Sequence, residues 1–406
     1  MADNKDKKIL NVPALRFPEF SGEWNTSSIE EQFELYSGNT PSRMDKKQFD
    51  GTVNWITSGE LKEHYIADTK EKISDEAVKS NNLKLLPVGT FVIAIYGLEA
   101  DGVRGTCSIT ASESTISQAC MAFISKKDIA NEFLYAWYKK HGNVIGIRYA
   151  QGTKQQNLSY DIIEKFNISY PCIEEQKKLI RFISLIDERI ATQNKIIEDL
   201  KKLKSAIVEM ILCKQGGVLL KLGDVGSFIR GLTYSSEDIA EDINATTVIR
   251  ANNLNYGNNV SKKDVVYVNK KPTEIQILRK GDIVICMANG SSSLVGKNSY
   301  YSFDDRQSTI GAFCGIYRSS QPLVKWLMQS QRYRRLVYQS LQGGNGAIAN
   351  LNGDDILNMT FYVVEDKKSV SILSALVLIE NSIAVNEKLQ ELYSMQKEYL
   401  LQHLFI

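Results

Sequence analysis

Two long segments without glycine or proline, 172–215 and 365–406, constrain the possible folds of this chain more than any other feature. In both, residues suited to a helix seam recur at alternating steps of three and four, the spacing that predicts an α-helix with a heptad repeat. The first seam is Ile183, Ile186, Ile190, Gln193, Ile197, Leu200, Lys204, Ile207 and Ile211. The second seam is Leu376, Ile379, Ile383, Asn386, Gln390, Tyr393, Lys397, Leu400 and Leu404.

The two seams are copies of one pattern. Each residue of the second seam lies 193 positions after its counterpart in the first. The polar interruptions also correspond, Gln193 with Asn386 and Lys204 with Lys397. Because a polar residue at a seam position lowers stability but fixes the register, we expect the two helices to pair with each other. The alternative is two unrelated amphipathic helices, each packed on its own domain.

The repeat extends upstream of the helices. Segment 157–163 matches segment 350–356 at the same offset, and the apolar stretch 89–97 resembles 281–290. The predicted order is therefore globular unit, long helix, globular unit, long helix. A helix of about 40 residues is roughly 60 Å long, enough to hold two globular heads apart.

The globular units are predicted to be mixed α/β, which makes the whole chain α+β with an internal pseudo-two-fold repeat. The strand-like segments include 88–96, 265–268 and 282–286. The helix-like segments include 132–140 and 323–340. The expected domains are 1–171, 172–215, 216–363 and 364–406.

Composition is that of an ordinary globular protein, with 43% hydrophobic residues, 24% charged residues and a formal net charge of +2. This charge does not by itself indicate a nucleic-acid-binding protein, although a local basic face is sufficient for phosphate contacts. No apolar run approaches the ~18 residues of a membrane span, and the start of the chain is polar. Six scattered cysteines without zinc or redox spacing suggest reduced thiols and a cytoplasmic protein.

Catalytic motifs are not evident in the sequence. The three histidines have no neighbours at metal-ligand spacing. Segment 290–298 resembles a phosphate-binding loop but has one residue too many and lacks the serine or threonine that holds magnesium, so we interpret it as a turn. Segment 344–349 resembles a dinucleotide fingerprint without the strand that should precede it. Glu365 and Asp366 suit the start of a helix, where acidic residues favour the helix dipole.

A DNA amino-methyltransferase would need an Asn/Asp-Pro-Pro-aromatic loop, and none of the seven prolines is adjacent to another. We therefore expect no active site, metal or cofactor in this chain. Any chemistry should belong to a partner.

Loops in both halves carry side chains that suit DNA. Asparagine and glutamine can bond adenine edges, arginine can bond guanine, and cations contact phosphates. The same amides are ordinary turn formers, and charged helix faces are often only solvated. Equivalent loops before equivalent helices favour the DNA-binding interpretation. The candidate DNA-binding residues are Thr153, Lys154, Gln155, Asn157, Arg250, Asn252, Asn253, Asn289, Ser291, Lys297, Arg332, Arg334 and Asn345.

These features together resemble the specificity (S) subunit of type I restriction-modification systems, over nearly the whole chain. The resemblance rests on the opening segment 12–24 (VPALRFPEFSGEW), on 170–176 (YPCIEEQ) before the first long helix, and on 221–226 (KLGDVG) at the start of the second unit. The duplicated order of head and helix is the most specific element. One departure is Val364, which stands where the first copy has Pro171, so the start of the second helix is less well defined.

The resemblance implies a function without catalysis in this chain. Each head would be a target recognition domain that reads one half of a split site in double-stranded DNA. The two helices would form an antiparallel coiled coil that spaces the heads and docks two methyltransferase subunits through its seam. Those partners would carry S-adenosylmethionine and methylate adenine N6. Restriction subunits, which use ATP and magnesium, could join the complex and cut DNA.

Two other hypotheses remain open from the sequence. The first is a scaffold that binds proteins with its duplicated heads and does not bind DNA. It differs from a DNA reader in a simple property, because affinity for duplex DNA depends strongly on salt. The second is an enzyme with an unrecognised site, which methylation by the purified chain alone would support.

Overall fold

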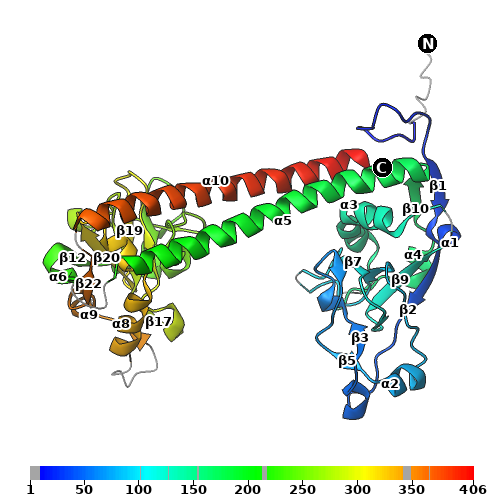
Figure 1. Cartoon of the computed structure of the whole chain (residues 1–406), viewed down its shortest axis with the longest axis horizontal. Helices are drawn as coiled ribbons and strands as arrows, with labels where there is room; N and C mark the ends of the chain where they lie inside the picture. Colours follow the sequence, from blue (N-terminus) through cyan, green and yellow to red (C-terminus); the bar gives the residue numbers. More distant parts are fainter. Residues whose placement is uncertain are drawn as a thin grey trace. The chain divides into compact units, whose positions relative to one another are not determined.

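The computed structural model describes residues 10–406 except 101, 127, 153–154, 213–216, 342–348 and 365. Contacts group the chain into two units. Unit 1 comprises Met1–Gln193 and Leu389–Ile406, and unit 2 comprises Asn194–Lys388. The two long helices, α5 (Ile173–Met210) and α10 (Asp366–Leu404), therefore each contribute residues to both units (Figure 1). The expected domains 1–171, 172–215, 216–363 and 364–406 stay a prediction, because this grouping by contacts does not test their bounds.

Unit 1 is built on a five-stranded sheet in the order β2-β9-β6-β7-β4 and a three-stranded sheet in the order β5-β3-β8. A separate antiparallel pair joins β1 to β10. Its strands are β1 (Asn25–Ser28), β2 (Phe33–Ser37), β3 (Val53–Ile56), β4 (Tyr65–Ile66), β5 (Lys72–Ile73), β6 (Phe91–Ala94), β7 (Cys107–Thr110), β8 (Ser114–Ile116), β9 (Cys120–Ser125) and β10 (Asn167–Tyr170). Its shorter helices are α1 (Ile29–Gln32), α2 (Asp75–Ser80), α3 (Asn131–Tyr149) and α4 (Tyr160–Ile163).

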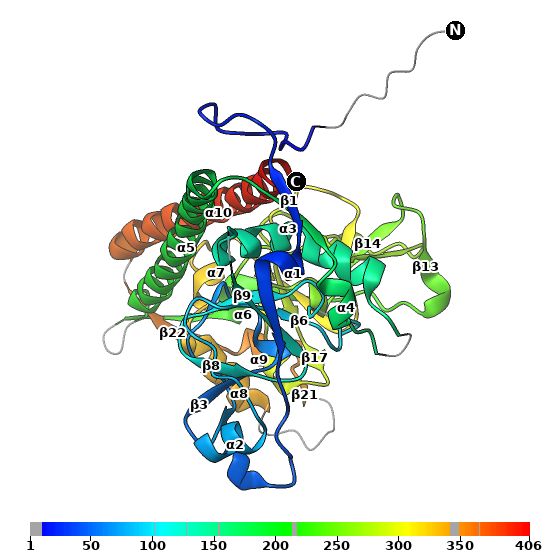
Figure 2. The same cartoon turned by 90° about the vertical axis from the view of Figure 1, so that its right-hand side faces the viewer.

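The core of unit 1 lies between its larger sheet and α3, which contacts β6, β7 and β9 (Figures 1 and 2). Phe91 of the sheet packs edge-on against Phe123, with 5.3 Å between ring centroids. The end of α10 completes this core, because Leu401, Leu404 and Phe405 are buried in the same cluster.

Unit 2 repeats the same plan. Its sheets have the orders β12-β20-β16-β18, β13-β15-β14-β19, β11-β22 and β17-β21. Its strands are β11 (Val218–Lys221), β12 (Gly226–Arg230), β13 (Ile239–Ala240), β14 (Thr246–Ile249), β15 (Val266–Val268), β16 (Ile283–Cys286), β17 (Ala288–Asn289), β18 (Asn298–Tyr300), β19 (Ser308–Ile310), β20 (Cys314–Ser319), β21 (Ala349–Asn350) and β22 (Thr360–Val363). Its shorter helices are α6 (Leu222–Val225), α7 (Val324–Leu327), α8 (Gln331–Leu341) and α9 (Gly353–Leu357).

The repeat inferred from the sequence is present in the pairing of strands. Asn25 pairs with Tyr170 in β1-β10, and Val218 pairs with Val363 in β11-β22, so both strands of the second pair lie 193 positions after those of the first. In each unit a strand with the sequence Ser-Thr-Ile, β8 or β19, pairs in parallel with β3 or β14. The duplication therefore covers the sheets as well as the helices.

The predicted helix 323–340 is wrong in one respect, because the structure divides it into α7 and α8. The break lies at Ser330, whose Oγ accepts a hydrogen bond from the backbone N–H of Tyr333 at 3.2 Å. A serine that bonds a backbone N–H in the first turn is a typical helix N-cap. The helix expected to reach residue 215 ends at Met210, because Ile211 and Leu212 pair with the chain at Val363 and Val364.

The half of α5 in unit 1 packs antiparallel to the end of α10. Ile183 and Ile186 are buried, and the Nζ of Lys397 donates to Asp187 at 2.5 Å. The predicted seam residue Tyr393 is half-buried, as are Ile190 and Leu400. Leu404 is buried.

In unit 2 the second half of α5 packs antiparallel to the first half of α10. Ile197, Leu376 and Ile383 are buried. The other predicted seam residues are half-buried: Leu200, Ile207 and Ile379. All predicted seam residues thus lie at buried or half-buried positions.

A partly buried charged cluster joins the two helices in unit 2. The carboxylate of Glu380 on α10 accepts from Lys204 of α5 at 3.4 Å and from Lys325 of α7. Both ammonium groups also lie over the Trp326 ring, at 5.4 and 4.7 Å from its centroid. Burial lowers the pKa of Lys204, against the raising effect of Glu380. Lys204 and Glu380 are the repeat counterparts of Lys397 and Asp187, so the polar interruptions of the seam form equivalent ion pairs in the two units.

Helix α10 is unusually apolar on its outer surface. By length and composition, Ser369–Leu404 is apolar enough to cross a membrane, because it contains an 18-residue window with a mean hydropathy of 1.5, of which 17% is buried. No membrane span was expected from the sequence, because the apolar residues of this helix are interrupted by polar ones. One such helix is weak evidence for a membrane span. Because Glu380 and Lys397 of this helix pair with α5, we interpret it as a helix-pairing element.

Candidate nucleic-acid interface

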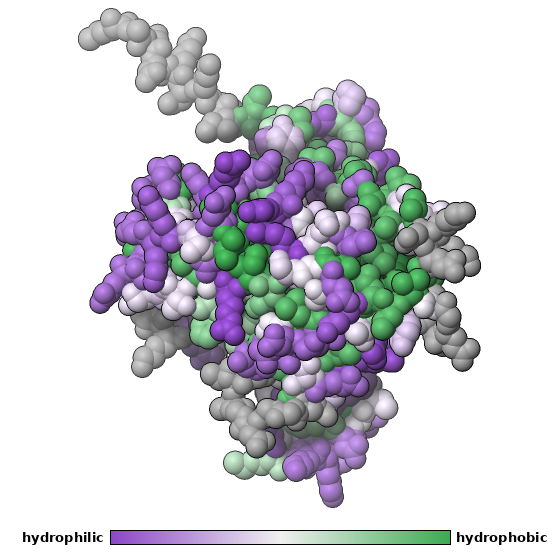
Figure 3. All heavy atoms as spheres, turned by 90° about the vertical axis from the view of Figure 1, so that its left-hand side faces the viewer, coloured by the Kyte–Doolittle hydropathy of each residue, from purple (hydrophilic) through white to green (hydrophobic). Residues whose placement is uncertain are grey.

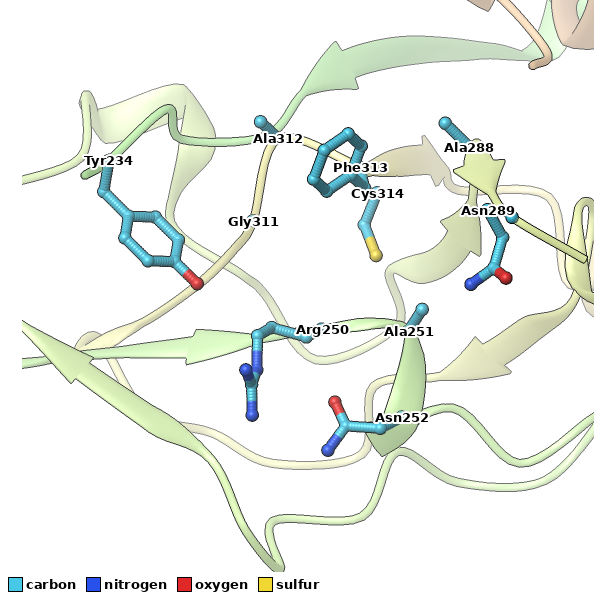
Figure 4. A pocket seen from close by; sticks show the side chains of 11 residues that line it. Tyr234, Arg250, Ala251, Asn252, Ala288, Asn289, Gly311, Ala312, Phe313 and Cys314 are labelled. Atoms are coloured by element: carbon cyan, nitrogen blue, oxygen red, sulfur yellow. The ribbon is translucent and has the colours of Figure 1, made fainter. Parts of the chain in front are cut away.

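Loops at the ends of several strands enclose a cavity of about 720 Å³ in unit 2 (Figure 4). Three sequence-predicted residues, Arg250, Asn252 and Asn289, line this cavity together. Arg250 follows β14 directly, and Asn289 ends β17. The remaining lining residues are Tyr234, Ala251, Ala288, Gly290, Gly311, Ala312, Phe313 and Cys314. The structure thus brings together residues from four separate parts of the sequence.

The backbone of Arg250 is fixed by a hydrogen bond, whereas the end of its guanidinium makes few contacts. Its backbone N–H donates to Asn253 Oδ1 at 2.9 Å. Its Nη2 has a long contact of 3.4 Å to the backbone oxygen of Asp264. Its Nε is buried without a hydrogen-bond partner among the residues that the structure describes. A guanidinium carries five N–H donors, and those on the two Nη atoms at its end can reach a ligand.

Amides and an exposed aromatic ring surround Arg250. Asn252 is exposed, and its amide lies on the same side of the loop as the Arg250 guanidinium (Figure 4). Asn289 is half-buried, and its Oδ1 accepts the backbone N–H of Ser291 at 2.9 Å. Phe313 is 69% exposed although it is a large apolar residue. Exposed aromatic and amide groups beside an arginine can contact nucleic-acid bases.

Asn253 was a wrong candidate. Its side chain is fully buried, with Oδ1 accepting from the Arg250 backbone and Nδ2 donating to Lys263 O at 2.7 Å. It closes the short 3₁₀ turn Ala251–Asn253 and is not available to DNA. In unit 1 the equivalent turn is closed by Glu60, whose carboxylate accepts from the backbone N–H of Thr57 at 2.9 Å.

Arg334 and Lys297 do not line the Arg250 cavity. Arg334 stacks on Tyr256, with the guanidinium carbon 4.5 Å from the ring centroid and Nε donating to the hydroxyl at 3.0 Å. Burial raises the pKa of this Tyr256 hydroxyl. Arg334 lines another cavity with Ser292 and Ser293. Arg332 is exposed on the same helix, Lys297 is half-buried, and Ser291 is exposed on the loop after β17.

In unit 1 the predicted loop is tied to the end of β6. Asn157 exchanges two backbone hydrogen bonds with Gln151, of 2.8 and 2.9 Å. Its Oδ1 also has a 3.4 Å contact with the backbone N–H of Gly97. Gln155 is exposed beside it. Thr153, Lys154 and Asn345 lie outside the described residues.

Tyr234, Phe313 and Thr57 were missed by the sequence reasoning. Thr57 follows β3 as Arg250 follows β14, and it begins an equivalent 3₁₀ turn. The 193-residue offset could have identified Thr57 as the counterpart of Arg250. Tyr234 and Phe313 carry no such signal, since they reach the cavity only through the pairing of sheets.

Histidine, cysteine and acidic side chains are the groups that most often hold metals or act as nucleophiles. No group of three or more of them in the described part of the chain is placed to hold a metal ion. Burial raises the pKa of the Cys107, Cys120 and Cys314 thiols to about 12, which disfavours the nucleophilic thiolate. His64 is stacked between Tyr65 and Tyr135 and bonds Glu132 at 2.9 Å.

The surface seen in Figure 3 is mostly hydrophilic, with apolar residues gathered in smaller patches. Such a mixed surface is ordinary for a soluble domain and also suits a polar partner. The chemistry of the Arg250 cavity, more than the general surface, therefore distinguishes a candidate binding site.

Comparison with known proteins identifies a family of similar sequences. Residues 21–202 match the type I restriction modification DNA specificity domain. The specificity subunit of the type I restriction enzyme MjaIX of Methanocaldococcus jannaschii is 27% identical over 185 residues, 45% of this chain and 42% of that protein. The EcoR124I/EcoR124II specificity subunit of Escherichia coli is 27% identical over 191 residues, 45% of this chain and 46% of that protein. These matches span about half the length of the curated relatives.

Solved structures share the fold over a larger part of the chain. The S subunit of a type I restriction-modification system from M. genitalium is 15% identical, covers 97% of this chain and 99% of its own, and has a TM-score of 0.59. A chain from a study of complex assembly and conformational transition in the type I system is 13% identical, covers 93% and 96%, and has a TM-score of 0.58. At these identities the likeness concerns the fold alone.

Proposed function

We propose that this chain, which is similar to specificity subunits of type I restriction-modification systems in sequence over about half of its length and in fold over most of it, recognises the DNA target of such a system. Each unit reads one half of a split sequence in double-stranded DNA. The observation that carries this proposal is the duplication of a complete unit, from the β1-β10 pair to the equivalent ion pairs Lys397–Asp187 and Lys204–Glu380. Two copies of one fold with different loop residues suit two different half-sites.

The cavity around Arg250 supports base recognition in unit 2. It combines a guanidinium, two amides and an exposed aromatic ring, which are groups that contact base edges or faces. Contacts to phosphates would come from cationic side chains such as the exposed Arg332. Because such contacts release counterions, the affinity of the complex for duplex DNA falls steeply as salt rises. A protein scaffold would not show this dependence.

We further propose that the outer surface of α10 binds the methyltransferase subunits. Leu378 and Val385 in unit 2 are 66% and 67% exposed, and Leu392 and Tyr399 in unit 1 are 48% and 55% exposed. These residues are spaced by seven, so they lie on one side of the helix and do not belong to the seam with α5. An apolar helix stripe of this kind is typical of a protein-binding surface.

In this proposal the chain is a non-catalytic cytoplasmic subunit, and the chemistry belongs to its partners. The methyltransferase subunits hold S-adenosylmethionine and methylate adenine N6. Restriction subunits that use ATP and magnesium join the same complex. The contribution of this chain is to choose the DNA sequence and to hold the partners on it.

The experiment that tests the function is genome-wide mapping of N6-methyladenine. A host that carries the methyltransferase partner is compared with and without this gene. We expect a split motif with a fixed unread gap to become methylated only when the gene is present. An active partner in complex with this chain that methylates no new motif would favour the scaffold.

A further inference from the structure

The two units present different side chains on the same backbone frame. In unit 1, β3 pairs in parallel with β8 and is followed by Thr57, whose turn is closed by Glu60. In unit 2, β14 pairs in parallel with β19 and is followed by Arg250, whose turn is closed by Asn253. Thr57 and Arg250 therefore occupy equivalent positions. The backbone arrangement at the two positions is the same, but threonine and arginine differ in the hydrogen bonds that they can donate.

The loop around Arg250 positions the stem of the side chain and leaves its charged end available. Gly311 lies beside the stem, since a Cβ there would be 3.8 Å from Arg250 Cγ and 3.6 Å from Val248 Cγ1. The backbone N–H of Gly311 is bonded to Ile249 O at 2.9 Å, which fixes this wall of the cavity. The Nη2 atom at the exposed end of the side chain has only a long contact of 3.4 Å, which leaves this end of the guanidinium open to a ligand.

A guanine edge suits this guanidinium better than a phosphate does. Arginine donates two parallel hydrogen bonds to O6 and N7 of guanine in the major groove. Asn252, Asn289 and Phe313 surround it with groups that suit bases. A phosphate contact is needed wherever a unit binds DNA, so we would expect a cation at both equivalent positions. A contact that reads a base should instead differ between units that read different half-sites.

We propose that Arg250 is a specificity-determining residue that reads one guanine in the half-site of unit 2. This inference rests on the proposed function, because it assumes that the units bind duplex DNA. It adds a chemical prediction about the target. One half of the motif contains a guanine recognised through its N7 and O6, and the equivalent position in the other half faces Thr57, which has no such fork of donors.

The test compares duplexes in which single guanines are replaced by 7-deazaguanine, which lacks the N7 acceptor. The full complex with its methyltransferase partner is used, and the target is first defined by methylation mapping. For the natural protein, we expect one substitution in one half-site to weaken binding about 10- to 100-fold. In the variant Arg250→Gln the same substitution should have almost no effect. The control Arg279→Gln, an exposed arginine outside the cavity, should keep the full sensitivity.

A second variant separates base reading from folding and from charge. Arg250→Lys keeps the positive charge and an ammonium that can still donate to guanine, but not the fork geometry, so it should keep only part of the 7-deazaguanine sensitivity while the salt dependence of binding stays the same. If Arg250→Gln does not fold, Arg250→Met, which also lacks the cationic donors, gives the deciding measurement.

The outcomes distinguish the inference from the proposed function. If the natural complex shows no sequence-specific binding, the proposed function fails. If it binds specifically but no guanine N7 matters, or if the full sensitivity persists when Arg250 is replaced by glutamine or methionine, the inference is overturned and the function stands. A loss of affinity in Arg250→Gln that is the same for all sequences and comes with a lower salt dependence, while Arg250→Lys keeps its affinity, would make Arg250 a phosphate contact and also overturn the inference.

Discussion

Replacement of Glu380 by glutamine should destabilise the helix pair of unit 2 more than any single change at the equivalent site of unit 1. Glu380 is 28% exposed, and it neutralises Lys204 and Lys325, which are 10% and 18% exposed. Glu380→Gln keeps the size of the side chain but leaves two ammonium groups close together beside Trp326. The loss therefore combines two attractions and one new repulsion.

The size of the effect follows from the distances. Two unit charges 3.4 Å apart attract by about 5 kcal/mol at an effective dielectric constant of about 20. Removal of one partner of a buried pair typically costs about 3–5 kcal/mol. Because Glu380 is partly exposed, solvent screening reduces this, and we expect Glu380→Gln to cost about 2–4 kcal/mol. Asp187→Asn breaks a single pair whose partners are 22% and 32% exposed, and we expect about 1 kcal/mol.

The assay is hydrogen exchange of the full chain, followed by mass spectrometry of peptides from α10 and α5. We expect faster exchange in the unit 2 half of both helices for Glu380→Gln and a smaller change in the unit 1 half for Asp187→Asn. Adding Lys204→Met to Glu380→Gln removes one of the two unpaired cations, so it should restore part of the lost protection.

Two results would refute this reasoning. In the first, Glu380→Gln costs no more than Asp187→Asn. In the second, Lys204→Met makes Glu380→Gln worse. Either would mean that solvent already screens the cluster.

Three further predictions concern the seam, pH and backbone packing. Leu200→Asp should weaken helix pairing by about 2–3 kcal/mol and reduce co-purification of the methyltransferase partner, and normal assembly of this variant would contradict the seam assignment. Burial and the nearby charge of Lys140 lower the pKa of His141 to about 4. The folded state therefore favours the neutral ring, and its contribution to the stability of unit 1 is complete above the ordinary histidine pKa. As the pH falls from about 7 towards 4, the free energy of unfolding should decrease by about 2 kcal/mol, after allowance for partial exposure. Urea titrations should show this slope in the natural protein, and a slope that persists in His141→Gln would assign it to other groups. A Cβ at Gly38 would overlap the backbone oxygen of Ile116, whereas one at Gly59 would meet open space. In thermal melts, Gly38→Ala should therefore lose more than about 2 kcal/mol of stability and Gly59→Ala little. Equal losses would contradict the close approach at Gly38.

The helices and the repeat could be predicted from the sequence because a heptad seam is a regular, long signal. For example, the seam residue Ile183 and its repeat counterpart Leu376 are both buried in the structure. The strands predicted at 88–96, 265–268 and 282–286 are confirmed as β6, β15 and β16. The signal for β6 and β16 was only a short apolar run, since both are buried along their whole length and show no alternation of apolar and polar residues. A short apolar run of this kind is ambiguous between a strand and a buried helix.

The candidate site could be predicted only in part, for a different reason. Arg250 and Asn252 were found because loops rich in amides and cations stand out in the sequence. Asn253 is also an amide, but its side chain forms hydrogen bonds with the backbone of its own loop. Phe313 comes from a loop more than 60 residues away and reaches the cavity through sheet pairing, which residue types alone do not reveal.

The grouping of residues into units has a consequence for synthesis on the ribosome. Unit 2 is one continuous stretch, Asn194–Lys388, whereas unit 1 also needs Leu389–Ile406. Leu401, Leu404 and Phe405 belong to the core of unit 1, so this core cannot be complete until the last of these residues has emerged. Domains usually fold in the order of their synthesis. Here the unit whose translation begins first is the last to receive all of its core residues.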